Sequence, residues 1–107
     1  MKKQIFKKYA DKISDIYDIS LKSLFKKNKT REVVDARQML YYLCYQRNMK
    51  IVQIQSFMEE QGYSISHSSI IHGINVVKEN TKNDQDYITF INNINNELHL
   101  TGHLQSS

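Results

Sequence analysis

The four histidines of this chain are the first candidates for metal ligands. They are His67, His72, His99 and His103. The first two are five positions apart, so a helix would not stack them on one face as it stacks ligands spaced by four. The last two have the spacing of four, but the chain has one cysteine and no acid lies beside them. We therefore expect no metal site.

Catalysis would need a nucleophile with an oriented base. Ser68 and Ser69 lie next to His67, yet no third group that would orient the imidazole suggests itself. A glycine-rich phosphate loop of the GxxxxGK[ST] type is also missing from the sequence, so we expect no nucleotide site. These patterns predict a protein that is not an enzyme and needs no cofactor.

Small polar residues at the start of a helix suit a different chemistry, which is hydrogen bonding to nucleic acid. The segment Ser66-His67-Ser68-Ser69 would open a helix whose exposed N–H groups favour an anion. Hydroxyl and imidazole groups can also bond to base edges in the major groove. Two alternatives stay open: the four residues are an ordinary N-cap, or His67, which falls on the Ile70 side of the helical wheel, is tucked beneath the turn.

The charge of the chain, +4 overall, is unevenly distributed. Five basic residues and no acid occur between Lys22 and Arg31, whereas residues 84–107 hold three acids and no Lys or Arg. Flexible cations bind DNA phosphates by releasing counterions, and Lys26, Lys27, Lys29 and Arg31 suit that task. A solvated basic face is the alternative explanation of the same cluster.

Length and composition predict one small domain. The chain has 107 residues, of which 40% are hydrophobic, enough for one core. The single Cys44 has no partner for a disulfide and reads as a buried apolar residue. No apolar run follows the basic N-terminus, and none approaches the roughly 20 residues of a membrane span. We expect a cytoplasmic protein with no membrane segment.

Apolar residues recur at helical spacing along the chain, which has no proline and three glycines. The stripes predict helices near residues 5–17, 21–25, 36–44, 51–58, 70–77 and 87–98. We expect Asp35 to cap the third, Gly62 to close the fourth, Ser66 to cap the fifth and the polar run 80–84 to end it. The globular domain should cover residues 1–98, with a frayed tail from 99 to 107.

Two segments resemble a known family. The run from Arg31 to Leu43, which contains Asp35-Ala36-Arg37-Gln38-Met39, is similar to the signature of the C-terminal DNA-binding domain (domain IV) of the bacterial replication initiator DnaA. The run from Ser66 to Gly73 parallels that family's Asp-His-Thr-Thr-Val-x-His-Ala motif. The similarity spans roughly Ile16 to Leu98 and includes no ATPase domain, so the chain looks like a stand-alone relative.

The resemblance implies a fold and a set of contacts. The fold is an all-α, compact bundle of about six helices of the Trp-repressor and DnaA domain IV type, with a helix-turn-helix from Lys50–Glu60 and Ser66–Thr81. Bases would be read in the major groove by Ser66, His67 and Ser68, and Lys29 would enter the minor groove. Contacts to the phosphate backbone would come from Lys27, Arg31, Arg37, Gln38, Ser69 and His72.

The sequence also departs from the family. Ser66 replaces an aspartate that accepts from a cytosine amino group, and Ile65 replaces an arginine. Lys29 replaces an arginine whose planar fork suits a narrow minor groove. Gln55 stands where a glycine is usual, and the turn before Ser66 is longer. We expect the architecture to match the family and the target sequence to differ from the initiator's usual box.

The expected function is therefore binding of double-stranded DNA, with sequence preference, by a nucleoid-associated protein that regulates replication initiation or transcription. One alternative is a module of the same fold that binds a replication initiator or another replication protein through exposed tyrosines among Tyr41, Tyr42 and Tyr45, although some of the three must belong to the core. Nonspecific DNA binding through charge is the other.

Overall fold

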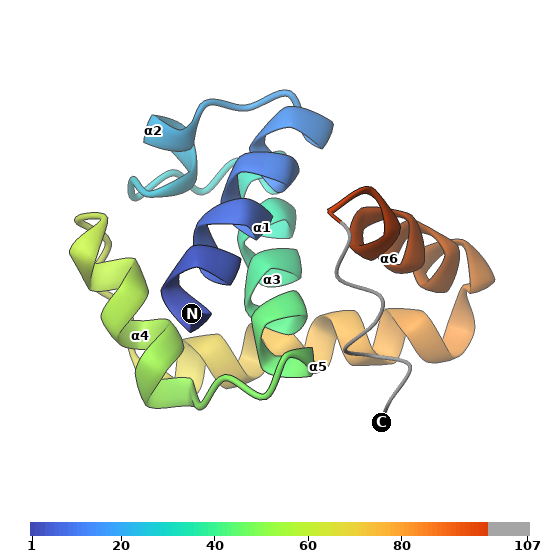
Figure 1. The fold of residues 1–107 in the computed structure, drawn as a ribbon. Coiled ribbons are helices and arrows are strands. Elements are labelled where there is room, and N and C mark those ends of the chain that lie inside the picture. Colours follow the sequence, from blue (N-terminus) through green and yellow to red (C-terminus); the bar gives the residue numbers. More distant parts are fainter. Residues whose placement is uncertain (99–107) are drawn as a thin grey trace.

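The computed structural model describes residues 1–98, which form six α-helices (Figure 1). They are α1 (Lys2–Ile16), α2 (Leu21–Leu24), α3 (Arg31–Gln46), α4 (Ile51–Glu60), α5 (His67–Asn83) and α6 (Gln85–Glu97). Because these residues contain no strand, the predicted all-α bundle is confirmed. None of the six helices has the length and apolar character needed to cross a membrane. The expected tail, with His99 and His103, lies outside the described residues.

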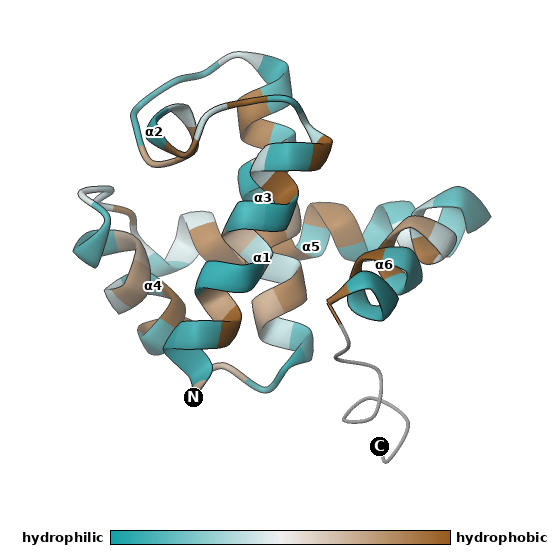
Figure 2. Cartoon of the chain, turned by 45° about the horizontal axis from the view of Figure 1, so that its top comes forward, coloured by the Kyte–Doolittle hydropathy of each residue, from teal (hydrophilic) through white to brown (hydrophobic). Residues whose placement is uncertain are grey.

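The core is built around α3. This helix packs against both α1 and α5, and it contributes the fully buried side chains of Leu40, Leu43 and Cys44. Phe6 and Ile13 of α1 belong to the same cluster, as their spacing predicts. Burial raises the pKa of the Cys44 thiol, which keeps it protonated and unreactive. Figure 2 shows hydrophobic and hydrophilic residues mixed along each helix, the pattern of helices with one buried face.

A glycine allows α5 to approach α3 closely. A Cβ atom at Gly73 would lie 3.0 Å from Tyr41 Cδ2 and 3.1 Å from Gln38 Cγ, which is closer than side chains normally pack. Gly73 therefore brings the second turn of α5 directly against the middle of α3. This contact positions the residues of the candidate site.

A buried chain of hydrogen bonds links α1, the end of α3 and α6. The Tyr9 hydroxyl donates to Asn95 Oδ1 at 2.6 Å and accepts from Arg47 Nε at 3.1 Å. All three side chains are buried. Because a buried polar group without a partner costs about 1–3 kcal/mol, these bonds favour one position of α6 on the bundle.

The start of α3 differs from the prediction. The helix begins at Arg31 with Thr30 as its N-cap residue, so Asp35 is not the cap. Asp35 lies inside the helix, 3.8 Å from the Arg31 guanidinium at the i, i+4 spacing of a helical ion pair. An acid is favourable both at a cap and in the first turns, near the positive end of the helix dipole, and this explains the error.

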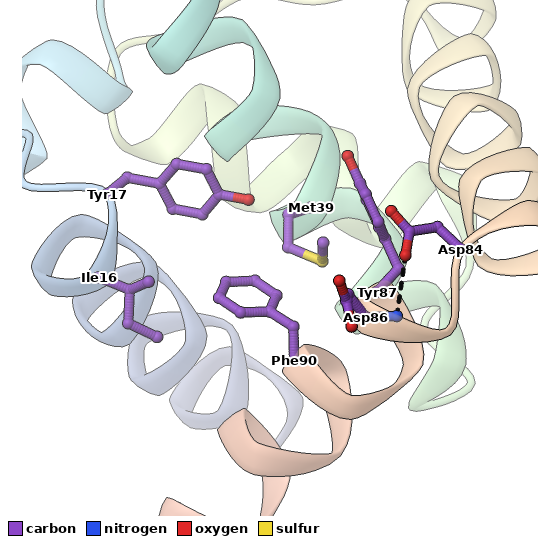
Figure 3. A pocket seen from close by; sticks show the side chains of 7 residues that line it. All are labelled: Ile16, Tyr17, Met39, Asp84, Asp86, Tyr87 and Phe90. Atoms are coloured by element: carbon purple, nitrogen blue, oxygen red, sulfur yellow. Dashed lines mark hydrogen bonds between the residues drawn. The ribbon is translucent and has the colours of Figure 1, made fainter.

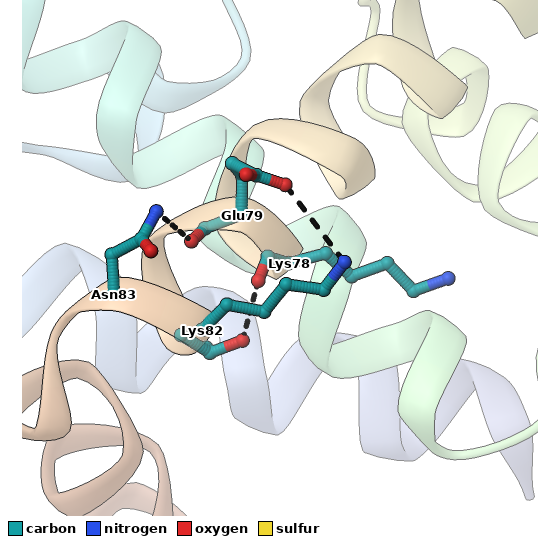
Figure 4. Close-up of polar contacts among 5 residues, drawn as sticks. Lys78, Glu79, Lys82 and Asn83 are labelled. Carbon is teal, nitrogen blue, oxygen red and sulfur yellow. Dashed lines mark hydrogen bonds and ion pairs between the residues drawn. The ribbon is translucent and has the colours of Figure 1, made fainter.

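The end of α5 also differs, because the helix continues to Asn83 through the polar run that was expected to end it. Thr81 Oγ1 donates to the Lys78 carbonyl at 2.6 Å. Asn83 Nδ2 donates to the Glu79 carbonyl at 3.1 Å (Figure 4). Both side chains donate to carbonyls three or four residues earlier in the chain, within the last turns of the helix. The chain changes direction only at Asp84, which caps α6.

Exposure distinguishes the three tyrosines of the suggested interaction surface. Tyr41 and Tyr42 are only 2% and 7% exposed, and of the three tyrosines only Tyr45 reaches the surface, at 42%. Two of the three tyrosines therefore belong to the core, because the central helix α3 is covered on more than one side, and a tyrosine surface would be reduced to Tyr45. Ile71 lies next to the buried Ile70 in an apolar segment, yet it is 45% exposed.

Candidate nucleic-acid interface

The first turn of α5 presents small polar side chains to solvent. Ser66, His67, Ser68 and Ser69 are all exposed. Ser66 is the N-cap, as predicted: its Oγ accepts from the Ser69 N–H at 3.2 Å and donates to the Ser69 Oγ at 3.0 Å. The Ser68 hydroxyl has no hydrogen-bond partner in residues 1–98. Ser68 is therefore the serine of this turn that is free to bond to a ligand.

His67 is held by a residue of α4. Its Nε2 lies 2.8 Å from Gln55 Oε1, and Gln55 Nε2 donates to the Ile65 carbonyl at 2.7 Å. The second bond fixes the orientation of the amide, so Gln55 Oε1 must accept and His67 Nε2 must donate. In the neutral ring Nδ1 is then the free acceptor. The ring is exposed, so His67 is not tucked beneath the turn.

Arg37 of α3 is buried, at 6% exposure. Its Nε donates to the Leu24 carbonyl at 2.9 Å, at the end of α2. Its Nη2 donates to the carbonyls of Lys26 at 2.6 Å and Asn28 at 3.2 Å. The guanidinium carbon also lies 4.5 Å from the centroid of the Tyr63 ring, in the connection before α5. Arg37 thus ties two connecting segments to α3, and its Nη1 has no acceptor among the described residues.

A groove of about 300 Å³ runs between α3 and the first turns of α5. It is lined by Val34, Arg37, Gln38, Tyr41, Ile65, Ser68, Ser69 and His72, and we call it the α5 groove. No acidic side chain of residues 1–98 lines it. The buried Tyr41 hydroxyl has no hydrogen-bond partner there, and burial, with the nearby Tyr63, raises the pKa of this group. The hydroxyl is consequently a neutral donor without an acceptor.

The connection from α2 to α3, residues 26–30, carries exposed lysines beside Arg37, and we call it the basic loop. Lys27 and Lys29 are exposed, and so is the side chain of Arg31 that follows. Asn28 Oδ1 accepts from the Thr30 N–H at 2.9 Å, a short-range bond typical of a turn. With Arg37 bonded to its carbonyls, the loop has a defined backbone that carries exposed cationic side chains.

The structure brings together five of the ten residues singled out from the sequence: Arg37, Gln38, Ser69 and His72, proposed for phosphates, and Ser68, proposed for a base. The others lie outside the groove, at the tip of α5 or on and beside the basic loop: Ser66, His67, Lys27, Lys29 and Arg31.

Three residues that shape this surface were not identified as site residues. Gln55 and Tyr63 hold His67 and Arg37, and Tyr41 lines the groove. The departure from glycine at position 55 was a visible signal for Gln55. Nothing in the sequence indicated that Tyr63 would stack on Arg37.

No group of three His, Cys, Asp or Glu side chains that could hold a metal ion occurs in the described part of the chain. Comparison with protein families, curated proteins and solved structures gives no match. The resemblance to DnaA domain IV therefore depends on the two sequence segments alone and stays a prediction.

Proposed function

We propose that this chain binds double-stranded DNA, with α4 and α5 acting as a helix-turn-helix and the first turn of α5 entering the major groove. The α5 groove is the observation that carries the proposal. There, donors from two helices distant in sequence meet in a cavity without acids, next to a basic loop. Such a surface suits a polyanion, and the exposed N–H groups of α5 favour phosphate as well.

Phosphate contacts would come from groups that are not consumed within the protein. Lys27 is an exposed cation, and Gln38 and His72 line the groove. Arg31 is also exposed, and its long, solvated ion pair with Asp35, at 3.8 Å, would compete only weakly with a phosphate. Arg37 supports this surface mainly from within, because it holds the backbone of the basic loop; only its Nη1 is left for a phosphate. These contacts set affinity and register but carry no sequence information.

Base reading would rest on Ser68 and His67. The Ser68 hydroxyl is free, and the His67 ring is held by Gln55 with one nitrogen left to bond. Ser66 contributes less, because its hydroxyl caps the helix. Lys29 would approach the minor groove as a point charge. This division follows DnaA domain IV, without the acid at position 66, and a role in replication initiation or transcription is the corresponding proposal.

Selection of binding sites from a random duplex library at near-physiological salt tests the proposal. An enriched motif is the expected result, since Ser68 and His67 can discriminate base edges. Binding without enrichment would leave only the charged backbone contacts and reduce the function to nonspecific DNA binding. Absence of binding even at low salt would contradict the proposal and favour a protein-binding module.

A further inference from the structure

A second cavity, of about 370 Å³, lies at the other end of α5, where the chain turns into α6. We call it the corner pocket. It is lined by Ile16, Tyr17, Met39, Asp84, Asp86, Tyr87 and Phe90. Figure 3 shows the side chains of Tyr17, Phe90 and Met39 next to one another, with the two carboxylates beside Tyr87. None of these residues belongs to the α5 groove or the basic loop.

Aromatic rings form the walls of the corner pocket. The rings of Tyr17 and Phe90 meet edge to face, with centroids 6.1 Å apart and an angle of 88°. Both rings and that of Tyr87 are half-buried, so part of each surface stays accessible. Desolvation, together with Tyr87 and Asp35 nearby, raises the pKa of Tyr17 to about 12. Its hydroxyl is thus neutral at physiological pH and brings no charge to the pocket.

Negative charge lines the same cavity, and residues 1–98 place no cation in its lining. Asp84 and Asp86 are exposed, and neither forms an ion pair within residues 1–98. Asp84 Oδ1 accepts from the Asp86 N–H, which leaves Oδ2 and the whole Asp86 carboxylate to a ligand. The positive end of the α6 dipole offsets roughly half a charge, less than the two carboxylates carry. No Lys or Arg of the described chain lines the pocket.

We propose that the corner pocket binds an arginine side chain from a basic segment of a partner protein. A guanidinium is attracted to the face of an aromatic ring and also pairs with a carboxylate through two parallel hydrogen bonds. Its planar shape and weak hydration suit it to this combination better than the compact ammonium of lysine. The walls and the carboxylates offer both interactions, and the apolar stem would pack near Met39.

The charge of the pocket distinguishes this partner from DNA. Two uncompensated carboxylates repel a phosphate backbone, and the pocket lies at the opposite end of α5 from the proposed DNA surface. The inference thus goes beyond the proposed function and does not depend on it. A partner bound here would leave the first turn of α5 free.

Titration of the ¹⁵N-labelled full chain with a short blocked peptide, Ac-Gly-Leu-Arg-Leu-Gly-NH₂, tests the proposal by NMR. We expect saturable shifts centred on the amides of Tyr17, Tyr87 and Phe90. The matched peptide with citrulline in place of arginine keeps the shape and loses the charge, so it should bind at least about tenfold more weakly.

The double variant Asp84→Asn/Asp86→Asn should reduce binding of the arginine peptide by a similar factor. Asparagine at position 84 still caps α6, so this variant keeps the helix start. Asp11→Asn/Glu59→Gln removes the same charge at exposed positions outside the pocket and should leave binding unchanged.

Equal binding of the arginine and citrulline peptides, or undiminished binding to the Asp84/Asp86 variant, would overturn the proposal. Shifts confined to other parts of the chain would do the same. Pocket shifts that grow with protein concentration in the absence of peptide would identify a second copy of this chain as the occupant and would also overturn it.

Discussion

The two ends of α5 carry cavities of similar size and opposite chemistry. At the N-terminal end, the α5 groove combines the apolar Val34 and Ile65 with hydroxyl, amide, imidazole and guanidinium groups, and no acid of residues 1–98 lines it. At the C-terminal end, the corner pocket has aromatic walls and two carboxylates and no cation of the described chain. In Figure 1, α2 and α4 lie on one side of the molecule and α6 on the other. The α5 groove and the corner pocket are therefore separated by the length of α5.

The basic and acidic segments, which are separated along the sequence, are thus also separated in space. The basic segment before α3 reaches one end of α5 because Arg37 bonds to its carbonyls. The acidic segment after α5 stays at the other end because Asp84 both ends that helix and caps α6. The central helix α3 contributes to both cavities, through Arg37 and Gln38 on one side and Met39 on the other. A small bundle can therefore offer two independent binding surfaces.

Replacement of Arg37 should have the largest effect. Arg37→Ala removes three hydrogen bonds from a buried guanidinium. The carbonyls of Leu24 and Asn28 lose the donor that Arg37 supplies, whereas the Lys26 carbonyl keeps the Asn28 N–H, and the free energy of unfolding should fall by about 3 kcal/mol. DNA affinity should also drop for every sequence alike, because the basic loop loses its support. Urea denaturation and binding to selected and scrambled duplexes measure the two effects.

Lys27→Ala is the matched control. It removes a cation from the same loop, but the Lys27 side chain is exposed, whereas that of Arg37 is buried. It should change stability by less than about 0.5 kcal/mol and flatten the salt dependence of DNA binding by about one charge. If Arg37→Ala proved as stable as Lys27→Ala, Arg37 would not be the residue that holds the loop.

Replacement of Ser68 comes next and concerns specificity. Ser68→Ala should cost about 1–3 kcal/mol of binding at one base position and little at the others, because its hydroxyl is free for a base edge. Thr89→Ala is the control: it deletes a hydroxyl from an exposed position of α6, at the opposite end of the molecule, and should leave the binding energy unchanged at every base position. Competition assays with single-base variants of the selected site provide the measurement. Uniform losses across all positions would move Ser68 to the phosphate contacts.

Local patterns predicted much of the fold. The apolar stripes gave all six helices, since burial of one face dictates the spacing in each. Ser66 was identified as a cap because its type and position meet a local backbone requirement, and the structure confirms it. The burial of Cys44 is likewise confirmed, as its apolar neighbours indicated.

Contacts between distant segments could not be predicted in the same way. An arginine in a helix reads as a surface cation, and only the packing of residues 24–28 against α3 makes Arg37 a buried donor. The sequence indicated that some of Tyr41, Tyr42 and Tyr45 are buried but not which, because it does not reveal that α3 is covered by both α1 and α5. The corner pocket was missed for the same reason, since its residues come from three separate segments.

Removal of the α6 cap should have a smaller effect, confined to the corner pocket end. Asp84→Ala deletes the acceptor of the Asp86 N–H and should lower the free energy of unfolding by about 1 kcal/mol, whereas Asp84→Asn should cost much less. Thermal or urea unfolding distinguishes them. Equal losses for both variants would mean that the charge of Asp84, rather than its capping bond, stabilises this corner.

The pH dependence of stability should show the smallest effect. Because the folded pKa of Tyr17 is raised to about 12 from an ordinary value of 10.0, the folded chain keeps this proton after the unfolded chain has lost it. The contribution is fully present below about pH 10 and is lost as the pH rises toward 12. Because Tyr17 is partly exposed, the free energy of unfolding should fall by less than about 1 kcal/mol between pH 10 and pH 11. Tyr17→Phe should accordingly flatten this part of the stability curve.

Tyr41→Phe provides the counterpart from the α5 groove. Burial also raises the pKa of Tyr41, so this variant should flatten the same alkaline range. At pH 8 it should be neutral or slightly stabilising, because the deleted hydroxyl has no partner in the described chain. Urea denaturation between pH 8 and 11 should be measured for both variants and for the unmodified protein. The lysines titrate alike in all three, so their effect drops out of the differences. A clear loss of stability for Tyr41→Phe at pH 8 would mean that its hydroxyl has a hydrogen-bond partner in the folded protein.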